Sequence, residues 1–269
     1  TWAAEPRVQI LSPKDGNRIT QDQNSLFVSG KVARDVGRSA NVDIFLVIDI
    51  SGSTALYAGV NLSDADQPPD SSGFGLPQIT IGGMSMGKPP LRNIRNSVLA
   101  AEVAAARRLL LQLNSQTTRV GVLTFSEGAR LMQPLTHDFD QVRRALEEIL
   151  RSGPYGGTNM VEGIRMAITE LMGLGSSEKR TDTIKVQFLL TDGFPTLPIG
   201  AGKGATPEDT NLAINAARLA GKAGVKVHVF ALGQEALSYP RAAVGIAKES
   251  GGTYTPVLRP ADALAVVEN

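Results

Sequence analysis

Three short segments, far apart along the chain, combine carboxylate and hydroxyl side chains with glycine. They are Asp49-Ile50-Ser51-Gly52-Ser53, Gly156-Gly157-Thr158-Asn159 and Thr191-Asp192-Gly193. Carboxylates, hydroxyls and water are hard oxygen ligands, which suit Mg²⁺, Mn²⁺ or Ca²⁺ rather than zinc or copper. If the fold brings the three segments together, two carboxylates and three hydroxyls can hold one divalent cation.

The charge of such a site decides what the cation can bind next. Asp49 and Asp192 supply two negative charges, which balance a dication and leave it electrophilic. Ser51 and Ser53 alternate with other residues, so a turning backbone can aim both hydroxyls at one point. Because some of the protein groups act through water, one coordination position stays open. We therefore expect a carboxylate of a partner to complete the coordination.

The elements that must position these segments follow from the apolar pattern after residue 41. Short apolar runs without polar alternation predict strands buried on both faces of a mostly parallel sheet, at residues 42–48, 120–125, 186–190 and 225–232. Apolar stripes at helical spacing predict helices between them: Leu99, Val103, Ala106, Leu110 and Leu113; Phe139, Val142, Leu146 and Ile149; Ile164, Ile168 and Leu171; Leu212, Ala216, Leu219 and Ala223. Residues 129–133 predict an antiparallel edge strand. The predicted fold is α/β: doubly wound, mostly parallel, with helices on both faces.

The three polar segments fall at corresponding places in this pattern. Two of them follow the predicted strands at residues 42–48 and 186–190, and the third opens the helix that contains Ile164. In open α/β sheets, ligands bind beyond the carboxyl ends of the strands. The segments are therefore expected to converge at one edge of the sheet.

In this order and placement, the segments resemble the metal-ion-dependent adhesion site of von Willebrand factor A domains. The resemblance covers roughly residues 42–268, and all five ligand positions are filled. It implies that Ser51 and Ser53 bind the metal directly and that Thr158 binds directly or through water. It also implies that Asp49 and Asp192 act largely through water. The implied cation is Mg²⁺, with Mn²⁺ or Ca²⁺ as alternatives, and the ligand face would include Gly52, Gly157, Asn159 and Gly193.

Two regions lie outside this pattern. Residues 1–36 predict two short strands, at 8–11 and 26–32, which resemble the opening strands of a bacterial immunoglobulin-like sandwich. This segment either packs on the metal-binding domain or belongs to a split sandwich into which that domain is inserted. Residues 54–96 are rich in Gly, Pro and Ser and form an insertion that compact members of the family lack. Because the insertion begins beside the metal segment, we expect it to shape or cover the ligand face.

Other motifs near the insertion are weaker. Residues 83–87 match the Gly-x-Ser-x-Gly pattern of a hydrolase nucleophile, and residues 82–88 resemble a phosphate-binding loop. Prolines 89 and 90 follow both, where each motif requires a helix. Asp64, Asp66 and Asp70 have neither the glycine nor the closing glutamate of a calcium loop. We interpret these residues as loop.

Composition excludes several function classes. There are 27 Lys and Arg against 26 Asp and Glu, so no broad basic surface for nucleic acid is expected. There are no cysteines, and no apolar run approaches the roughly 20 residues of a membrane span. The chain starts at Thr1 without an initiator Met or signal peptide, so we interpret it as a piece of a longer protein.

The function expected from these features is divalent-cation-dependent protein binding, in adhesion or assembly, and not catalysis. The expected partner is a protein or glycoprotein with an acidic residue. The family resemblance implies an extracellular or cell-surface location. Two alternatives stay open: a metal-assisted hydrolase, and a scaffold whose metal site only orders loops.

Overall fold

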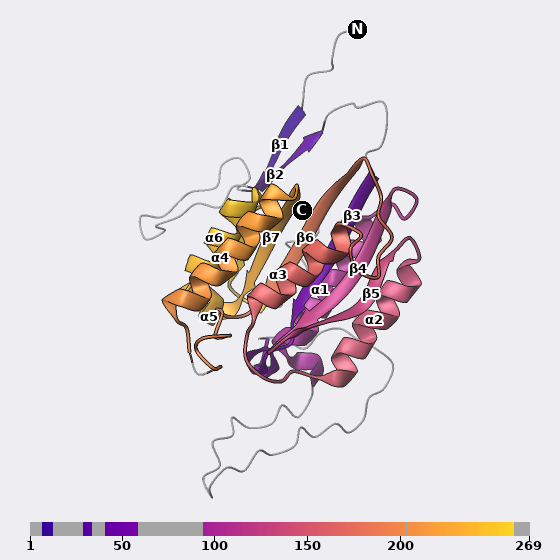
Figure 1. The fold of residues 1–269 in the computed structure, drawn as a ribbon. Helices are drawn as coiled ribbons and strands as arrows, with labels where there is room; N and C mark the ends of the chain where they lie inside the picture. Colours follow the sequence, from indigo (N-terminus) through magenta and orange to yellow (C-terminus); the bar gives the residue numbers. More distant parts are fainter. Residues whose placement is uncertain (1–6, 13–28, 34–40, 59–93, 203, 261–269) are drawn as a thin grey trace, which may run out of the picture.

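The computed structural model describes residues 7–12, 29–33, 41–58, 94–202 and 204–260 (Figure 1). Its main element is a six-stranded sheet with the strand order β5-β4-β3-β6-β7-β8. The strands are β3 (Asn41–Asp49), β4 (Thr118–Phe125), β5 (Ala129–Thr136), β6 (Thr183–Thr191), β7 (Val225–Leu232) and β8 (Tyr254–Val257). Within this sheet only β4 and β5 pair in antiparallel fashion, so the predicted mostly parallel sheet with one antiparallel edge strand is confirmed.

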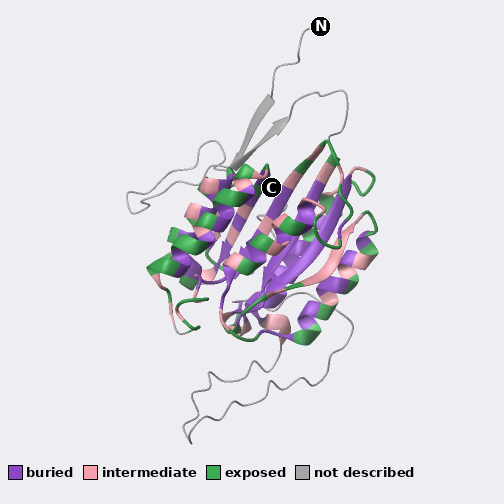
Figure 2. Ribbon diagram, viewed as in Figure 1, coloured by how far each residue is buried: buried purple, intermediate pink, exposed green. Residues whose placement is uncertain are grey.

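Helices cover both faces of this sheet. They are α1 (Val98–Gln112), α2 (Phe139–Ser152), α3 (Met160–Leu171), α4 (Pro207–Lys222), α5 (Gly233–Ser238) and α6 (Arg241–Ser250). On central strand β3, Phe45 and Val47 pack with α3, α4 and α6, while Ile44, Leu46 and Ile48 pack with α1 and α2. Because successive side chains of a strand point to opposite faces, an unbroken apolar strand fills both cores. The buried strands lie between half-exposed helices in Figure 2, and the doubly wound arrangement is confirmed.

Helix α4 contains most of the predicted apolar stripe, but only part of that stripe is buried. Leu212 and Leu219 are 38% and 57% exposed, whereas Ala216 is buried together with Ala213, Ala217 and Ala220. The reason is the close approach of α6. A Cβ on Gly221 would lie 2.8 Å from the Glu249 carbonyl oxygen, so only small residues fit between the two helices.

Three elements at the carboxyl end of the domain were not predicted. Helices α5 and α6 and strand β8 follow β7, and β8 extends the sheet as a parallel edge strand. Helix α6 buries Ala242, Ala243, Ile246 and Ala247, a stripe that contains one large apolar residue. Strand β8 has only four residues and includes a proline. The apolar stripe of α6 and the short strand pattern of β8 are therefore both weak signals in the sequence.

The insertion leaves and re-enters the domain at one point. Residues 59–93 lie outside the described residues, together with the Gly-rich and Asp-rich motifs within them. Short 3₁₀ helices flank them, Gly52–Ala55 (η1) and Ile94–Asn96 (η3). Val98 N–H donates to the Leu56 carbonyl at 2.9 Å, and Ala58 N–H donates to the Asn96 carbonyl at 2.8 Å. These antiparallel contacts close the base of the insertion.

The amino-terminal segment contains two described strands, β1 (Arg7–Ser12) and β2 (Ser29–Ala33). They pair in antiparallel fashion as a separate two-stranded sheet, with a register shift between Ile10 and Ser12. The prediction of two short strands is therefore supported in outline. The other residues of segment 1–36 lie outside the described part, so the split immunoglobulin-like sandwich stays a prediction. No helix of the described residues is long and apolar enough to cross a membrane.

Candidate metal centre

The first and third polar segments meet at the carboxyl ends of β3 and β6, which are parallel neighbours in the sheet. The Thr191 hydroxyl donates to Asp49 Oδ2 at 2.6 Å, and the Ser53 hydroxyl donates to Asp192 Oδ1 at 2.7 Å. The hydroxyl oxygens of Ser51 and Ser53 are 3.2 Å apart. Four of the five predicted ligand residues thus belong to one hydrogen-bonded cluster.

The second polar segment forms the opposite wall of the site. Gly52 N–H donates to the Gly156 carbonyl at 2.9 Å, which joins the first and second segments. An open cavity of about 200 Å³ lies between the segments, and Ser51, Ser53 and Thr158 all line it. The structure therefore brings the fifth predicted residue, Thr158, to the same point.

The four predicted ligand-face residues have different positions. Gly157 and Gly193 line the cavity, and Gly52 is exposed beside it. Asn159 is 7% exposed, and its side chain is directed into the fold. Its amide donates to the Glu127 carbonyl at 2.9 Å, while its oxygen caps the start of α3. Asn159 is therefore absent from the cavity lining, and its role in the structure is to position the neighbouring Thr158.

Local hydrogen bonds fix the backbone of the first segment. Asp49 Oδ1 accepts from Ser51 N–H at 2.8 Å, and the Thr54 hydroxyl donates to the Ser51 carbonyl at 2.8 Å. Short polar side chains commonly stabilise turns in this way. The turn places the hydroxyls of Ser51 and Ser53 on the same side.

Thr158 is held by a residue that sequence reasoning missed. Thr158 N–H donates to the Thr196 hydroxyl at 2.9 Å, and Thr196 N–H donates back to the Thr158 carbonyl at 2.9 Å. A Cβ on Gly157 would lie 2.9 Å from Leu197 Cδ1 and 3.1 Å from the Thr196 hydroxyl, so a larger residue would crowd this contact. Thr196 comes five residues after Thr191 in the loop that follows β6, where no sequence motif marks it.

Both carboxylates of the site, Asp49 and Asp192, are buried. Burial raises the pKa of Asp49 to about 6, although hydrogen bonds from Ser51 and Thr191 act in the opposite direction. Burial, with the charge of Asp49 as the next cause, raises the pKa of Asp192 well above its usual range. None of the ion pairs among the described residues includes either carboxylate. A bound cation would supply the missing positive charge.

One more carboxylate lies near the site and was not predicted. Glu102, in α1, is fully buried, and neither of its carboxylate oxygens has a hydrogen-bond partner in the described part of the chain. Its pKa is raised well above the usual range by burial first, and then by the charges of Asp49 and Asp192. The signal in the sequence was a lone acidic residue in the otherwise apolar stretch 98–106.

Hydroxyl ligands are essential to this candidate centre. Among the residues that the structure describes, no group of three or more His, Cys, Asp or Glu side chains is arranged to hold a metal ion. The site accordingly depends on two aspartates together with the hydroxyls of Ser51, Ser53 and Thr158. Such a donor set consists only of hard oxygen atoms.

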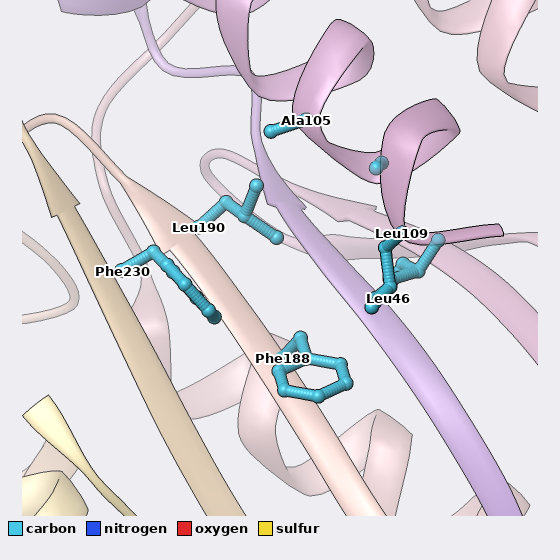
Figure 3. Close-up of a pocket in the computed structure, with 7 residues that line it drawn as sticks. Leu46, Ala105, Leu109, Phe188, Leu190 and Phe230 are labelled. Atoms are coloured by element: carbon cyan, nitrogen blue, oxygen red, sulfur yellow. The ribbon is translucent and has the colours of Figure 1, made fainter. Parts of the chain in front are cut away.

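A second cavity of about 140 Å³ is entirely different in chemistry. It lies between α1 and the sheet and is lined by Leu46, Ala105, Ala106, Leu109, Phe188, Leu190 and Phe230 (Figure 3). The side chains in Figure 3 come from α1 and from strands β3, β6 and β7. Because the lining contains no ionisable side chain, it offers no ligand to a metal.

Comparison with known families identifies the domain. The family model for the von Willebrand factor type A domain matches residues 82–194. The match includes the second and third polar segments and begins after the first. Together with the fold, it shows that this chain carries a von Willebrand factor type A domain, as the sequence resemblance predicted. No protein of curated function matches the sequence.

Solved structures show the same fold at low sequence identity. The hypothetical protein BatB from Bacteroides thetaiotaomicron is 18% identical, with a TM-score of 0.55 over 85% of this chain and 96% of that one. The pilus adhesin SpaC from Lactobacillus rhamnosus GG is 17% identical, with a TM-score of 0.55 over 86% and 30% of the two chains. Proximal thread matrix protein 1 from the mussel byssus, solved with a zinc-occupied adhesion-site motif, is 18% identical, with a TM-score of 0.50 over 85% and 45%.

Proposed function

We propose that this chain is a divalent-cation-dependent protein-binding module that acts in adhesion or assembly. The observation that carries the proposal is the convergence of Ser51, Ser53, Thr158, Asp49 and Asp192 at one edge of the sheet. Ser51 and Ser53 would hold the cation directly, Thr158 directly or through water, and the two aspartates largely through water. A bound cation supplies a Lewis-acidic position for an oxygen of the partner.

The residues of the site fit such a cation. Asp49 and Asp192 are 0% and 4% exposed, and burial without a cation makes their ionised forms unfavourable. The oxygen donor set suits Mg²⁺ first, with Mn²⁺ and Ca²⁺ as alternatives. Zinc occupies the adhesion-site motif of the mussel byssus protein, so zinc belongs among the cations to be tested.

The rim of the cavity offers a surface for a protein partner. Phe194 lines the cavity, and its ring meets Tyr239 edge to face at a centroid distance of 5.0 Å. Tyr239 is 58% exposed, and Tyr155, next to Gly156 of the cavity wall, is 55% exposed. Aromatic side chains are enriched in protein interfaces. The partner would be a protein or glycoprotein whose acidic residue reaches the metal between these rings.

A location outside the cell or on its surface fits this proposal. Structural neighbours include a pilus adhesin and a protein of the mussel byssus, and their names place both in extracellular assemblies. We extend that setting to this chain only as part of the proposal.

The ionisable side chains around the cavity support a binding site rather than the site of a metal-assisted hydrolase. A metal-assisted hydrolase needs a base that other groups orient beside the metal. Glu235 is an ionisable lining residue and is exposed, but no side-chain hydrogen bond orients it among the described residues. His137 and His228 contact Ser115 and Thr253 and do not line the cavity.

The proposal predicts that millimolar Mg²⁺ stabilises the folded protein. At a hundredfold excess over its Kd, a ligand that binds only the folded state contributes about 2.7 kcal/mol. For a domain of this size, the Tm should rise by roughly 5–10 °C between EDTA and Mg²⁺. Differential scanning calorimetry measures the shift, and titration calorimetry with Mg²⁺, Mn²⁺, Ca²⁺ and Zn²⁺ gives the order of preference.

Two serine variants separate a specific site from general effects of the salt. Ser53→Ala removes a proposed ligand and should abolish most of the shift. Ser152→Ala removes a hydroxyl at the exposed end of α2, where it donates to the Glu148 carbonyl, and should leave the shift intact. Equal wild-type Tm values in EDTA and in saturating Mg²⁺, Mn²⁺, Ca²⁺ and Zn²⁺ would contradict the proposal.

A further inference from the structure

Glu102 differs from the carboxylates that the fold uses for structure. Asp43 is fully buried, but Arg119 binds both of its oxygens, at 2.9 and 2.8 Å. Glu170 accepts hydrogen bonds from the backbone of Ser176 and Ser177. In both cases the fold supplies donors to the buried oxygens, as stable proteins generally do.

A fourth buried carboxylate follows the same rule. Asp209, in the first turn of α4, accepts from Ile199 N–H, Gly200 N–H and the Thr206 hydroxyl, each at 2.8 Å. Glu102 has no such donor in the described part of the chain, although it is 0% exposed. A buried polar group without a partner destabilises a protein, and a buried charge does so more strongly. The oxygens of Glu102 therefore need a partner that the described residues do not provide.

The surroundings of Glu102 indicate what that partner is. The charged groups that act on Glu102 are Asp49 and Asp192, and both disfavour its ionised form. Asp49 ends β3, Asp192 directly follows β6, and Glu102 lies in the second turn of α1. Three neighbouring carboxylates repel one another unless a positive charge lies among them. The missing group is thus a cation together with its water.

Glu102 does not form a three-carboxylate ligand group with the two aspartates in the described part of the chain. The described residues contain no cluster of three acidic or His side chains that could hold an ion. A water molecule bound to the cation can link Glu102 to the cation instead, since metal-bound water donates strong hydrogen bonds to carboxylates.

We propose that Glu102 is a positioning residue of the metal centre, whose carboxylate accepts hydrogen bonds from water that the cation holds beside Asp49 and Asp192. The proposal rests on the cation-binding function proposed above. This role places the fully buried Glu102 side chain of α1 in the metal site and gives its two unpartnered oxygens hydrogen-bond donors. The ionised carboxylate of Glu102 also raises the number of negative charges around the dication from two to three, which favours retention of the cation.

The test is the substitution Glu102→Gln, which keeps the size of the side chain and removes its charge. In EDTA at pH 7, the variant should melt a few degrees above the wild type, because the repulsion between Glu102 and the two aspartates is gone. Its Kd for Mg²⁺, measured by titration calorimetry, should be at least tenfold weaker. A purely structural role for Glu102 does not produce these two opposite changes.

Glu170→Gln is the matched control, because it removes the charge of another buried glutamate. Glu170 is fully hydrogen-bonded, so its variant should lose Tm in EDTA and keep the wild-type Kd for Mg²⁺. Glu102→Met is a second test variant, in which an apolar chain of similar length replaces the carboxylate. It should gain Tm in EDTA and also bind Mg²⁺ more weakly, which keeps the test open if the Gln variant folds poorly.

The outcomes distinguish this inference from the proposed function. If the wild type binds Mg²⁺ and both Glu102 variants bind it equally well, Glu102 does not contribute to cation binding and the inference is wrong. If the wild type binds none of the four cations, the proposed function fails and the inference fails with it. If the Glu102 variants bind Mg²⁺ more weakly and Glu170→Gln keeps the wild-type Kd, the result supports both the proposed function and the inference on Glu102.

Discussion

Asp49 makes the stability of the metal-free protein depend on pH in an unusual direction. Its pKa in the folded protein is about 6, against 3.8 for an unperturbed aspartate. The folded state therefore binds a proton more tightly than the unfolded state between these values. Where the folded state binds more protons, stability falls as pH rises. In EDTA, the Tm should decrease between pH 4 and pH 6, and the raised pKa values of Asp192 and Glu102 should extend the decrease to higher pH.

Mg²⁺ should reverse this trend, because a cation competes with the proton for the same carboxylate. The Tm gain from Mg²⁺ should be small at pH 5 and complete above pH 7. Calorimetric scans in EDTA and in Mg²⁺ between pH 4 and pH 8 measure both curves. Asp49→Asn is the control, since it should remove the Mg²⁺ gain and flatten the EDTA curve. A Tm in EDTA that rises from pH 4 to pH 6 would be inconsistent with this account.

Residues with local motifs could be predicted from the sequence, and residues that act through tertiary placement could not. Asp49, Ser51 and Ser53 lie within five positions, so their chemistry is visible in one short segment. Glu102 lies in an apolar stretch, and only the packing of α1 on the sheet brings it near two aspartates. Thr196 supports Thr158 although the two residues are 38 positions apart, with α3 and β6 between them.

At the scale of elements, the closed base of the insertion predicts that its outer part can be removed. Replacing residues 59–93 by a short Gly/Ser linker keeps the hydrogen bonds of Leu56 with Val98 and of Ala58 with Asn96. We expect the shortened protein to fold and to keep the Mg²⁺-dependent Tm shift, because loop length changes closure free energy only slowly. Calorimetry in EDTA and in Mg²⁺ checks both points.

The same shortened protein tests whether the insertion selects the partner. Proteins retained from a native extract in Mg²⁺ and released by EDTA should be lost when residues 59–93 are replaced. Full-length Asp49→Ala serves as the comparison, because it should lose retention through the metal and not through the insertion. If the shortened protein retains the same proteins as the wild type, the insertion is a spacer.

Element prediction succeeded where apolar side chains were large and failed where they were small. Strand β4 is buried at all eight positions, and its apolar run identified it directly. Helix α4 was found, but its leucines misled the choice of face because the helix presents alanines to α6. Helix α6 itself packs mainly through alanine, so its apolar pattern in the sequence is too weak to distinguish a helix from a loop. Close helix contact needs small residues, and small residues carry little periodic signal.

At the scale of the whole molecule, the described strands form two separate sheets. All six strands of the larger sheet and all six α-helices lie within residues 41–260, and β1 and β2 are hydrogen-bonded as a sheet of their own. A chain that starts at Asn41 should therefore keep the Tm in Mg²⁺ to within about 3 °C, a shift that corresponds to roughly 1 kcal/mol in a domain of this size. A larger drop would indicate that residues 1–36 pack on this domain, which was the alternative to a split sandwich.

The two ends of the sheet differ in their electrostatics. Near the amino ends of the strands, Arg119 and Arg180 both pair with the buried Asp43, so the fold itself neutralises that carboxylate. At the carboxyl ends, the donors to Asp49 and Asp192 among the described residues are hydroxyl and amide groups. Protein side chains neutralise the buried carboxylate at the first edge, whereas no ion pair among the described residues neutralises those at the second. This difference supports the proposal that a cation binds at the carboxyl ends of the strands.

The backbone ladder between residues 56–58 and 96–98 has a consequence for how such domains diversify. Because the chain exits and returns through neighbouring hydrogen-bonded residues, sequence beyond this ladder can change without altering the core. Doubling the length of a flexible loop costs only about 0.6 kcal/mol in closure entropy. The ladder is therefore a natural graft point: a foreign recognition peptide placed between Ala58 and Ile94 would be displayed next to the cation site, on a scaffold that folds independently of it.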